Sequence, residues 1–392
     1  MMTGCSAEDV TREVTPGDAV AISFNCNNEE GMTRGAYQGA MNIEDLYTTG
    51  FGVFASVTAN NDPEDAGYAD ANKPDLMYNQ EVEYTFVGDM ENPKTGYWSY
   101  QPVKYWPADM KHFFISAYAP YVEPSSLASL TADDTGIIGL STNTEKPYVE
   151  YRRCESPQSC VDLLWYYASP TKIPEGTASQ AEGTLNMKMR HALARVAINV
   201  ALAAPITNTK VLIEEISLTG KMAKTAQLHL YEQTTVTEGV APSTVTKYYP
   251  KWSDWTYDKN DGDEEINHTI LINNKEKKEN DENNTTSYGI IDSQIRYIEG
   301  MPYAWQPEGL RADDPLTTDK NEGLQNALST GDRQTYIYLI PQENWSVTVQ
   351  VKYKKWVEGN DEPTSGTKSV ATYANPLKGN TPYVLNITLS DI

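Results

Sequence analysis

The sequence predicts an all-β protein that folds as two antiparallel, immunoglobulin-like β-sandwiches in tandem. Among its 392 residues are 26 Tyr, and Gly (25) and Pro (22) interrupt the chain at short intervals. Aromatic and β-branched residues favour strands, and Gly and Pro mark the turns between them. Short apolar runs that alternate with polar residues recur along the chain, and no long amphipathic helix interrupts them. Strands at this spacing are typical of β-sandwich domains.

The chain is long enough for two domains that each bury a core. We expect a lipoprotein signal remnant and tether over residues 1–18, an N-terminal sandwich over 19–183 and a C-terminal sandwich over 184–392. The boundary falls at the end of a stretch rich in Pro, Gly, Thr and Ser, 170–183. A polar segment rich in Asp, Glu, Lys and Asn, 253–287, is predicted to be a surface insertion.

The first expected strand covers residues 19–24, because Val20, Ile22 and Phe24 alternate with small and polar residues. A polar, loop-like segment follows it, from residue 25 to residue 35. The same kind of pattern predicts further strands at 51–57, 81–87, 97–105, 113–118, 148–153, 161–168, 196–200, 211–218, 227–231, 335–340, 347–353 and 383–389. The strands at 148–153 and 161–168 flank a short loop, and we expect them to pair as a hairpin.

The chain carries 54 acidic and 31 basic residues, which leaves a formal net charge of -23. Nucleic-acid affinity depends on cationic side chains that release counterions, so nucleic acid is excluded as a partner. The same charge repels anionic lipid head groups, and no stretch approaches the roughly twenty apolar residues of a membrane-spanning helix. Attachment to a membrane therefore requires a covalent anchor.

A candidate anchor lies near the start of the sequence. Thr3-Gly4-Cys5 resembles the end of a bacterial lipoprotein signal, in which small residues precede a Cys that becomes acylated, with palmitate among the acyl groups. The alternative is a chance Gly-Cys pair. The following tract, Ser6-Ala7-Glu8-Asp9, resembles acidic sequences that route lipoproteins to the outer face of the outer membrane. We expect lipidation at Cys5 and a surface-exposed location on the cell outer membrane.

The sequence offers no starting point for catalysis. The four histidines are far apart and none has a paired metal-ligand spacing: His112, His191, His229 and His268. Nucleophile-elbow, phosphate-loop and dinucleotide-binding motifs are absent from the sequence. We therefore expect no enzyme activity, no cofactor and no bound metal.

Cys154 and Cys160 bracket five residues at the tip of the expected hairpin. In an oxidising envelope they can form a disulfide, although a spacing of six residues also permits two free thiols. Zinc is a poor alternative because no His or further Cys lies nearby in the sequence. Cys26 is then unpaired.

Two further patterns have a functional and a structural explanation. The segment 258–265 places oxygen-bearing side chains at alternate positions, as a calcium loop does, but it also fits a solvated acidic loop. Aromatic side chains that can stack on sugars or fill a core are Tyr97, Trp98, Tyr100, Tyr105, Trp106, Trp252 and Trp255.

Several segments, in the order in which they occur, resemble the fimbrillin-like proteins of the Bacteroides group. They are Gly52-Val53-Phe54-Ala55, Tyr105-Trp106-Pro107, Phe113 to Pro120, Asp162-Leu163-Leu164, Met189 to Val196, Tyr338 to Gln342 and Gly379 to Leu389. No single one of these motifs is specific, and the resemblance rests on their sum. The segment 253–287 departs from the family pattern.

The resemblance implies a type V pilus component with two transthyretin-like β-sandwich domains, export as a lipoprotein, and cleavage by an Arg-specific protease. In this sequence the cut falls between Arg34 and Gly35 and releases the strand that contains Val20, Ile22 and Phe24. Loss of a strand leaves unpaired backbone groups and an exposed apolar floor until a strand from another subunit fills the groove.

Near the C-terminus, Tyr383, Leu385, Ile387 and Leu389 alternate as a donor strand does, and they can equally complete their own sheet. We expect a structural or adhesive subunit of a cell-surface fimbria, assembled by strand donation. Its partners are other fimbrial subunits, an Arg-specific protease, the lipid of the outer membrane and a host protein or glycan. The alternative is a stand-alone surface lipoprotein that binds glycans or host proteins and keeps Arg34 uncut.

Overall fold

The computed structural model confirms an all-β fold in which the described strands form four sheets. It describes residues 21–28, 41, 43–58, 73–87, 96–106, 112–155, 160–172, 184–202, 209–238, 243–271, 337–357, 364–374 and 376–389. Two short helices accompany the strands, α1 (Ile43–Thr49) and α3 (Pro124–Leu127). In the described part of the chain, neither helix is long and apolar enough to cross a membrane.

The largest sheet has seven strands in the order β1-β9-β8-β5-β2-β3-β4. They are β1 (Ser23–Asn28), β9 (Thr184–His191), β8 (Leu164–Lys172), β5 (His112–Ala119), β2 (Phe51–Thr58), β3 (Met77–Phe86) and β4 (Gly96–Ser99). Every neighbouring pair is antiparallel except β1 and β9, which are parallel.

The other three sheets are smaller. One contains β13 (Ser243–Thr256), β12 (Thr225–Glu238), β7 (Tyr148–Arg152) and β6 (Gly136–Leu140). A second contains β14 (His268–Leu271), β11 (Thr209–Gly220), β16 (Trp345–Val357) and β17 (Thr364–Ala374). The third contains β15 (Ile337–Leu339), β10 (Ala194–Leu202) and β18 (Pro382–Leu389), of which β10 and β18 are parallel.

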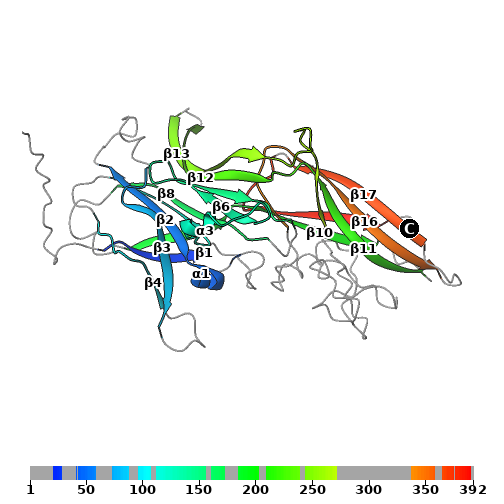
Figure 1. Ribbon diagram of the computed structural model, residues 1–392, viewed down its shortest axis with the longest axis horizontal. Coiled ribbons are helices and arrows are strands. Elements are labelled where there is room, and N and C mark those ends of the chain that lie inside the picture. The colour runs from blue at the N-terminus through cyan, green and yellow to red at the C-terminus, as the bar shows by residue number, and fades with distance from the viewer. Residues whose placement is uncertain are drawn as a thin grey trace, which may run out of the picture.

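Three apolar cores lie between these layers. The seven-stranded sheet buries Phe51, Phe113 and Met187 on one face, against α1, and Phe54 and Tyr118 on the other, against the β13-β12-β7-β6 sheet. A separate core joins the two remaining sheets. The strands β1 to β4 lie toward one end of the elongated molecule and β11, β16 and β17 toward the other (Figure 1).

The first strand lies four residues further along the chain than expected. The sequence predicts a strand over 19–24 followed by a loop, whereas β1 extends to Asn28. The apolar alternation continues through Cys26, which is 4% exposed, while Asn25 turns outward and donates to Asn186 Oδ1 at 2.9 Å. Asparagine side chains that bond across an exposed sheet face resemble a loop in composition, which accounts for the error.

The predicted hairpin of residues 148–153 and 161–168 is wrong. β7 pairs with β6 and β12, whereas β8 pairs with β5 and β9 in a different sheet. Tyr151 and Leu164 are both fully buried, in different cores. The loop between the two strands therefore leads from one layer of the sandwich to the next.

Strand pairing crosses the expected domain boundary at residue 183. β9 lies beyond it and pairs with β1 and β8, and β12 lies beyond it and pairs with β7. The tandem division of the chain stays a prediction, and any boundary placed there separates strands that are hydrogen-bonded to one another.

The expected surface insertion at 253–287 is built into the sheets in its first part. Residues 253–256 complete β13, and β14 pairs with β11. The Trp255 indole N–H donates to the Pro341 carbonyl at 2.8 Å, and its ring packs against the core. This part of the segment is therefore packed against the sheets rather than being a solvated loop. Residues 272–287 lie outside the described residues.

Candidate functional site

The first strand, β1, completes the edge of the seven-stranded sheet beside β9. Its register runs from Ser23 opposite Thr184 to Asn28 opposite Met189. The Ser23 and Thr184 hydroxyls lie 2.7 Å apart, which adds a side-chain hydrogen bond on the outer face of this ladder. β1 therefore occupies one flank of β9 over six residues.

The chain just before β1 bonds to a segment at the far edge of the same sheet. The Ile22 N–H donates to the Lys104 carbonyl at 2.9 Å, and Ala21 forms a bridge with Tyr105. The Tyr100 hydroxyl lies 2.8 Å from the Ile22 carbonyl and accepts the Lys104 N–H at 3.1 Å. The first strand thus fills the space between β9 and residues 100–105.

The inner face of this segment fills part of a core. Ile22, Phe24 and Cys26 are 1%, 5% and 4% exposed. The Phe24 ring centroid lies 6.0 Å from that of Phe51 and 5.3 Å from that of Tyr100. Fully burying a large apolar side chain contributes about 1.5–3 kcal/mol, so loss of this strand exposes an apolar floor at a substantial free-energy cost. Burial also raises the pKa of the Cys26 thiol.

The C-terminal strand β18 lies at the edge of the three-stranded sheet and pairs with β10 over eight residues, from Pro382 opposite Arg195 to Leu389 opposite Leu202. Ile387 is 3% exposed, and Tyr383 and Leu385 are half-buried against the same core. In this chain the predicted donor residues therefore complete their own sheet.

β9 and β10 are separated by only Ala192 and Leu193. The strand β1 runs parallel to β9, and β18 runs parallel to β10. Both terminal strands therefore follow the direction of the segment 184–202. β1 and β18 therefore share their direction relative to this segment, and in each strand the inward-facing side chains are spaced by two residues.

A buried pair joins two segments that are 29 residues apart in sequence. Asp162 Oδ2 lies 2.5 Å from His191 Nδ1 and accepts the Met41 N–H at 3.0 Å, while its other oxygen accepts the Leu163 N–H at 2.9 Å. Asp162 is fully buried, and His191 and Met41 are 4% and 1% exposed. The Asp162 carboxylate, which His191 also contacts, therefore fixes the backbone at Met41.

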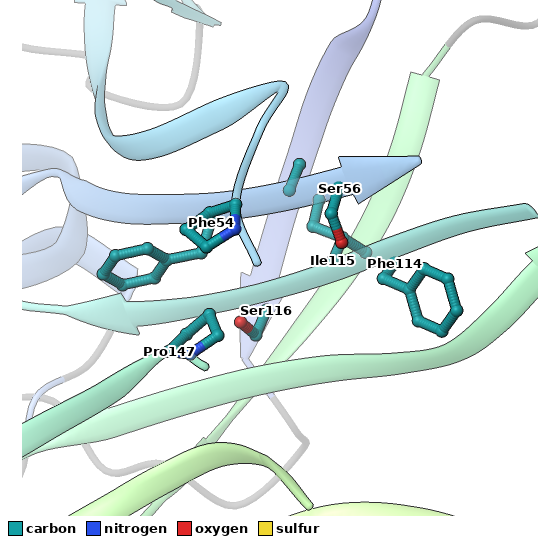
Figure 2. A pocket seen from close by; sticks show the side chains of 8 residues that line it. Phe54, Ser56, Phe114, Ile115, Ser116 and Pro147 are labelled. Carbon is teal, nitrogen blue, oxygen red and sulfur yellow. The ribbon is translucent and has the colours of Figure 1, made fainter. Parts of the chain in front are cut away.

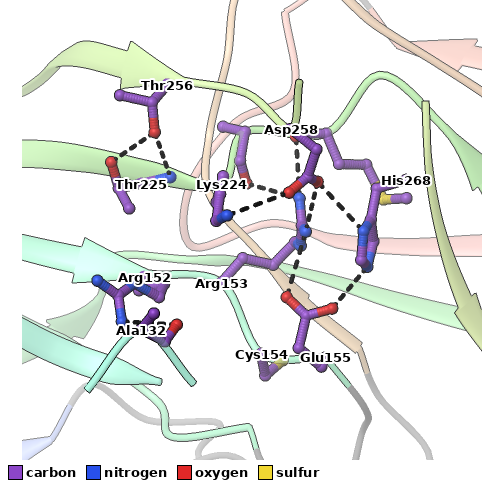
Figure 3. Close-up of polar contacts among 12 residues, drawn as sticks. Ala132, Arg152, Arg153, Cys154, Glu155, Lys224, Thr225, Thr256, Asp258 and His268 are labelled. Atoms are coloured by element: carbon purple, nitrogen blue, oxygen red, sulfur yellow. Dashed lines mark hydrogen bonds and ion pairs between the residues drawn. The ribbon is translucent and has the colours of Figure 1, made fainter. Parts of the chain in front are cut away.

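A second polar cluster surrounds Arg153, whose side chain is fully buried (Figure 3). Its guanidinium donates to Asp258 at 2.8 Å and to Glu155 at 3.3 Å. His268 lies between the two carboxylates, 2.9 Å from Glu155 and 3.2 Å from Asp258, and Lys224 lies 3.5 Å from Asp258. Burial raises the pKa of Asp258, but Arg153, His268 and Lys224 outweigh it and the net shift is downward.

Next to this cluster, Cys154 and Cys160 form a disulfide with a Cα–Cα distance of 4.9 Å. Both are buried, and the bond lies between the end of β7 and the residues that lead into β8. It closes the corner between two sheets rather than a hairpin tip. Cys26, in β1, is a free thiol.

A small hollow lies where the β2 and β5 side chains face Pro147 (Figure 2). Phe54 and Ser56 come from β2, and Phe114 and Ser116 from β5. Its volume of about 10 Å³ is near the lower limit for a single water molecule, so it holds no substrate.

The aromatic residues highlighted by the sequence are divided between core and surface. Trp98 and Tyr100 are 9% and 8% exposed, whereas Tyr97 and Tyr105 are more than half exposed and lie at the β4 end of the sheet. Trp252 and Trp255 pack partly against the core that contains Phe54 and Tyr118, and Trp106 packs against the core that contains Phe51 and Phe113.

The segment 258–265, for which a solvated acidic loop and a calcium loop are the alternatives, contains a tight turn. Asn260 Oδ1 accepts the N–H groups of Gly262 and Glu264 at 2.9 and 3.0 Å, so the side chain is committed to the turn. Across the described ranges, no three His, Cys, Asp or Glu side chains are grouped to hold a metal ion. Four predicted site residues lie outside the described part of the chain: Cys5, Val20, Arg34 and Gly35.

Sequence reasoning missed the residues that hold the first strand and its surroundings. Tyr100 was one of several strand aromatics, and His191 one of four isolated histidines. Both Asp162 and His191 lie in the segments that carry the family resemblance, but nothing in the sequence indicates that the two side chains meet.

The described residues form an all-β fold in which an edge strand near the N-terminus fills part of a core. Comparison with known proteins agrees with this fold. Residues 42–295, more than half of the chain, match the family described as fimbrillin-like. The chain belongs to the fimbrillin-like family. It is 23% identical to the fimbrium subunit Fim1C of Phocaeicola vulgatus, over 92% of this chain and 94% of that protein.

Among solved structures, a fimbrial protein from Bacteroides vulgatus is similar with a TM-score of 0.51 and 16% sequence identity. The similarity covers 94% of this chain and 95% of that chain. It extends the agreement in fold to nearly the whole length.

Proposed function

We propose that this protein is a structural or adhesive subunit of a cell-surface fimbria that assembles by strand exchange. The observation that carries the proposal is the position of β1. It pairs with one strand, β9, and the chain before it bonds to residues 100–105, yet Ile22, Phe24 and Cys26 fill a core. Removing such a strand leaves unpaired backbone groups and an apolar floor, which a strand of matching alternation can refill.

The partner is a second copy of this chain or a related fimbrial subunit, and the donor is its C-terminal strand. Tyr383, Leu385 and Ile387 have the spacing of Ile22, Phe24 and Cys26. The parallel pairing of β18 with β10 supports insertion beside β9 in the same direction. As donor, β18 leaves its place in its own sheet, which requires its contacts there to be replaced.

Processing and location follow from the same proposal. An Arg-specific protease cuts after Arg34 and frees the first strand, and the new chain begins at Gly35. Lipidation at Cys5 anchors the precursor to the outer membrane until that cut. The role is non-enzymatic.

The test uses the purified chain, an Arg-specific protease and a synthetic peptide of residues 381–391. After cleavage we expect the peptide to bind stably and the uncut chain to exclude it, measured by native gel and mass spectrometry. A matched peptide with Leu385→Asp should fail, because a buried carboxylate without a partner is strongly unfavourable.

Two chain variants separate cutting at the proposed site from cutting elsewhere in the N-terminal region. Arg34→Gln should block both strand release and peptide binding, whereas Arg12→Gln should leave both unchanged. If Arg34 resists the protease in the folded chain, or if the cut chain keeps β1 and excludes the peptide, strand exchange is wrong and a stand-alone surface protein is the better description.

A further inference from the structure

A hollow of about 200 Å³ lies over β8 and β9. Trp165, Tyr166 and Tyr167 of β8 line it together with Lys188 and Arg190 of β9. It is far larger than the hollow beside Pro147, and it differs from it in chemistry because it combines aromatic rings with two cations.

The side chains of β9 divide between the two faces of the sheet. Met187 and Met189 are fully buried in the core that contains Phe24, while Lys188 and Arg190, which alternate with them, are exposed. Since successive side chains of a strand point to opposite faces, both cations lie on the face away from that core. Trp165, paired with Arg190 in the ladder, lies on the same face.

The rings and the guanidinium form an ordered surface. The Trp165 and Tyr167 rings are stacked, with centroids 5.2 Å apart and planes inclined by 21°. The guanidinium carbon of Arg190 lies 5.8 Å from the centre of the Trp165 ring, within the range of a cation–π contact. The contact with Trp165 favours one ordered position of the Arg190 side chain at the wall of the hollow.

This combination suits a sugar ring that carries a carboxylate. Indole and phenol rings offer flat apolar surfaces with a polar edge, which can stack on the C–H face of a sugar. The Arg fork matches a carboxylate with two hydrogen bonds, and Lys adds a compact charge. The volume is below the roughly 300 Å³ at which pockets for drug-sized molecules begin, so it admits about one ring.

Charge selects the acidic sugar over a neutral one. The chain has a net charge of -23, so most of its surface repels anions. In the described part of the chain, this hollow places two cations beside stacked aromatic rings and so offers an anion local attraction. We propose that the β8–β9 hollow binds a terminal acidic monosaccharide unit, of the uronic acid or sialic acid class.

This proposal is independent of how subunits assemble. β9 carries the hollow on one face and β1 along its edge, and the proposed contacts leave the β1 ladder intact. A chain that exchanges strands but binds no acidic sugar overturns only this inference, and a chain that binds the sugar but resists cleavage overturns only strand exchange.

The experiment titrates the purified, uncut chain with D-glucuronate and with D-glucose, which differ only at C6, and follows binding by calorimetry and saturation-transfer NMR. N-acetylneuraminate serves as a second acidic probe. We expect saturable binding of at least one acid, at least tenfold weaker binding of glucose, and weaker acid binding as NaCl rises, since salt screens exposed charges.

Variants locate the binding. Arg190→Gln and Trp165→Ala should each weaken acid binding by about tenfold, the loss expected when a charge-assisted hydrogen bond or a stacking surface is removed. The matched controls Lys146→Gln and Tyr97→Ala remove an exposed cation and an exposed aromatic ring elsewhere, and should change nothing. Thermal unfolding checks that each variant is folded.

Three results would overturn the proposal. They are glucose binding as tightly as glucuronate, no binding of either acid at millimolar concentrations, and acid binding that Arg190→Gln and Lys146→Gln weaken equally.

Discussion

At the scale of single residues, Arg153 and its neighbour Arg152 offer a matched comparison. The Arg153 side chain is fully buried and donates to Asp258, Glu155 and the Met222 carbonyl. Arg153→Ala leaves the half-buried Asp258 carboxylate without its main partner, and breaking a buried pair in this way costs about 3–5 kcal/mol. We expect that loss in the free energy of unfolding, measured by urea denaturation.

Arg152→Ala is the control for that loss. Its guanidinium donates to the carbonyls of Thr131, Ala132 and Asp134 in an exposed loop, so its removal should cost about 1–2 kcal/mol. Equal losses in the two variants would contradict a special role for the buried cluster.

The same cluster predicts a pH dependence of stability. Burial lowers the pKa of His268, and the Arg153 charge lowers it further, against the raising effect of Glu155 and Asp258. The folded state therefore binds its proton less readily than the unfolded state does. Stability from this group is fully present above the unfolded pKa of about 6.5 and falls as the pH drops below it. Asp258, whose pKa is lowered, adds a further loss below about pH 4.

We expect the melting temperature to fall between pH 7.5 and pH 5.5, and His268→Gln to remove most of that fall, in thermal scans at constant ionic strength. His229→Gln is the control, since His229 lies on β12 and contacts Ser253 rather than the Arg153 cluster. A melting temperature that rises on acidification would show that the pKa shift of His268 has the opposite sign. An equal fall in the His268→Gln variant would show that other groups dominate the pH dependence.

Residue-level prediction from sequence succeeded where a local pattern decides burial. Alternation identified Ile22 and Phe24 as inward-facing. The six-residue spacing permitted the Cys154–Cys160 bond that the structure contains, but it equally permitted two free thiols. Prediction from sequence could not find the Asp162–His191 pair, because a hydrogen bond between two segments far apart in sequence leaves no periodic trace. Only the fold brings Asp162 and His191 together.

At the scale of elements, one of the contacts that hold the chain just before β1 is a single hydroxyl, which can be removed cleanly. Tyr100→Phe removes the contacts with the Ile22 carbonyl and the Lys104 N–H but keeps the ring against Phe24. We expect a loss of about 1–3 kcal/mol, because the buried Ile22 carbonyl loses a partner. Amide hydrogen exchange should quicken in β1, and strand release after cleavage should be faster.

Tyr105→Phe is the matched control. The Tyr105 side chain is 52% exposed, and the residue meets Ala21 through its backbone, so the substitution should leave exchange in β1 unchanged. Exchange that quickens equally in both variants would contradict the assignment of Tyr100 as the residue that holds the strand.

The strands themselves were largely predictable, and their partners were not. Apolar alternation located β2, β5 and β16 to within a few residues of 51–57, 113–118 and 347–353. Sequence neighbours 148–153 and 161–168 were expected to pair, but fully buried Tyr151 and Leu164 belong to different cores. Periodicity indicates which face of a strand is apolar, but it does not indicate which sheet covers that face.

At the scale of the whole molecule, the net charge of -23 affects association more than folding. Two copies that exchange strands must approach one another against mutual repulsion, and salt screens that repulsion. Salt has the opposite effect on the proposed sugar site, because Lys188 and Arg190 attract an anion and salt weakens that attraction. One variable, ionic strength, therefore distinguishes the two proposals.

Raising NaCl from about 0.01 M to about 0.15 M shortens the Debye length from about 30 Å to about 8 Å. We expect the rate of polymer formation by the cleaved chain to rise by roughly tenfold or more over that range, in time courses read on denaturing gels, because steering effects on association rates reach this size. Glucuronate affinity should fall over the same range. Sucrose at equal osmolarity is the control and should leave both unchanged. Slower polymer formation in salt would contradict this expectation. It would mean that attraction between charged surfaces limits the rate at which two copies join, and that entry of an apolar strand does not.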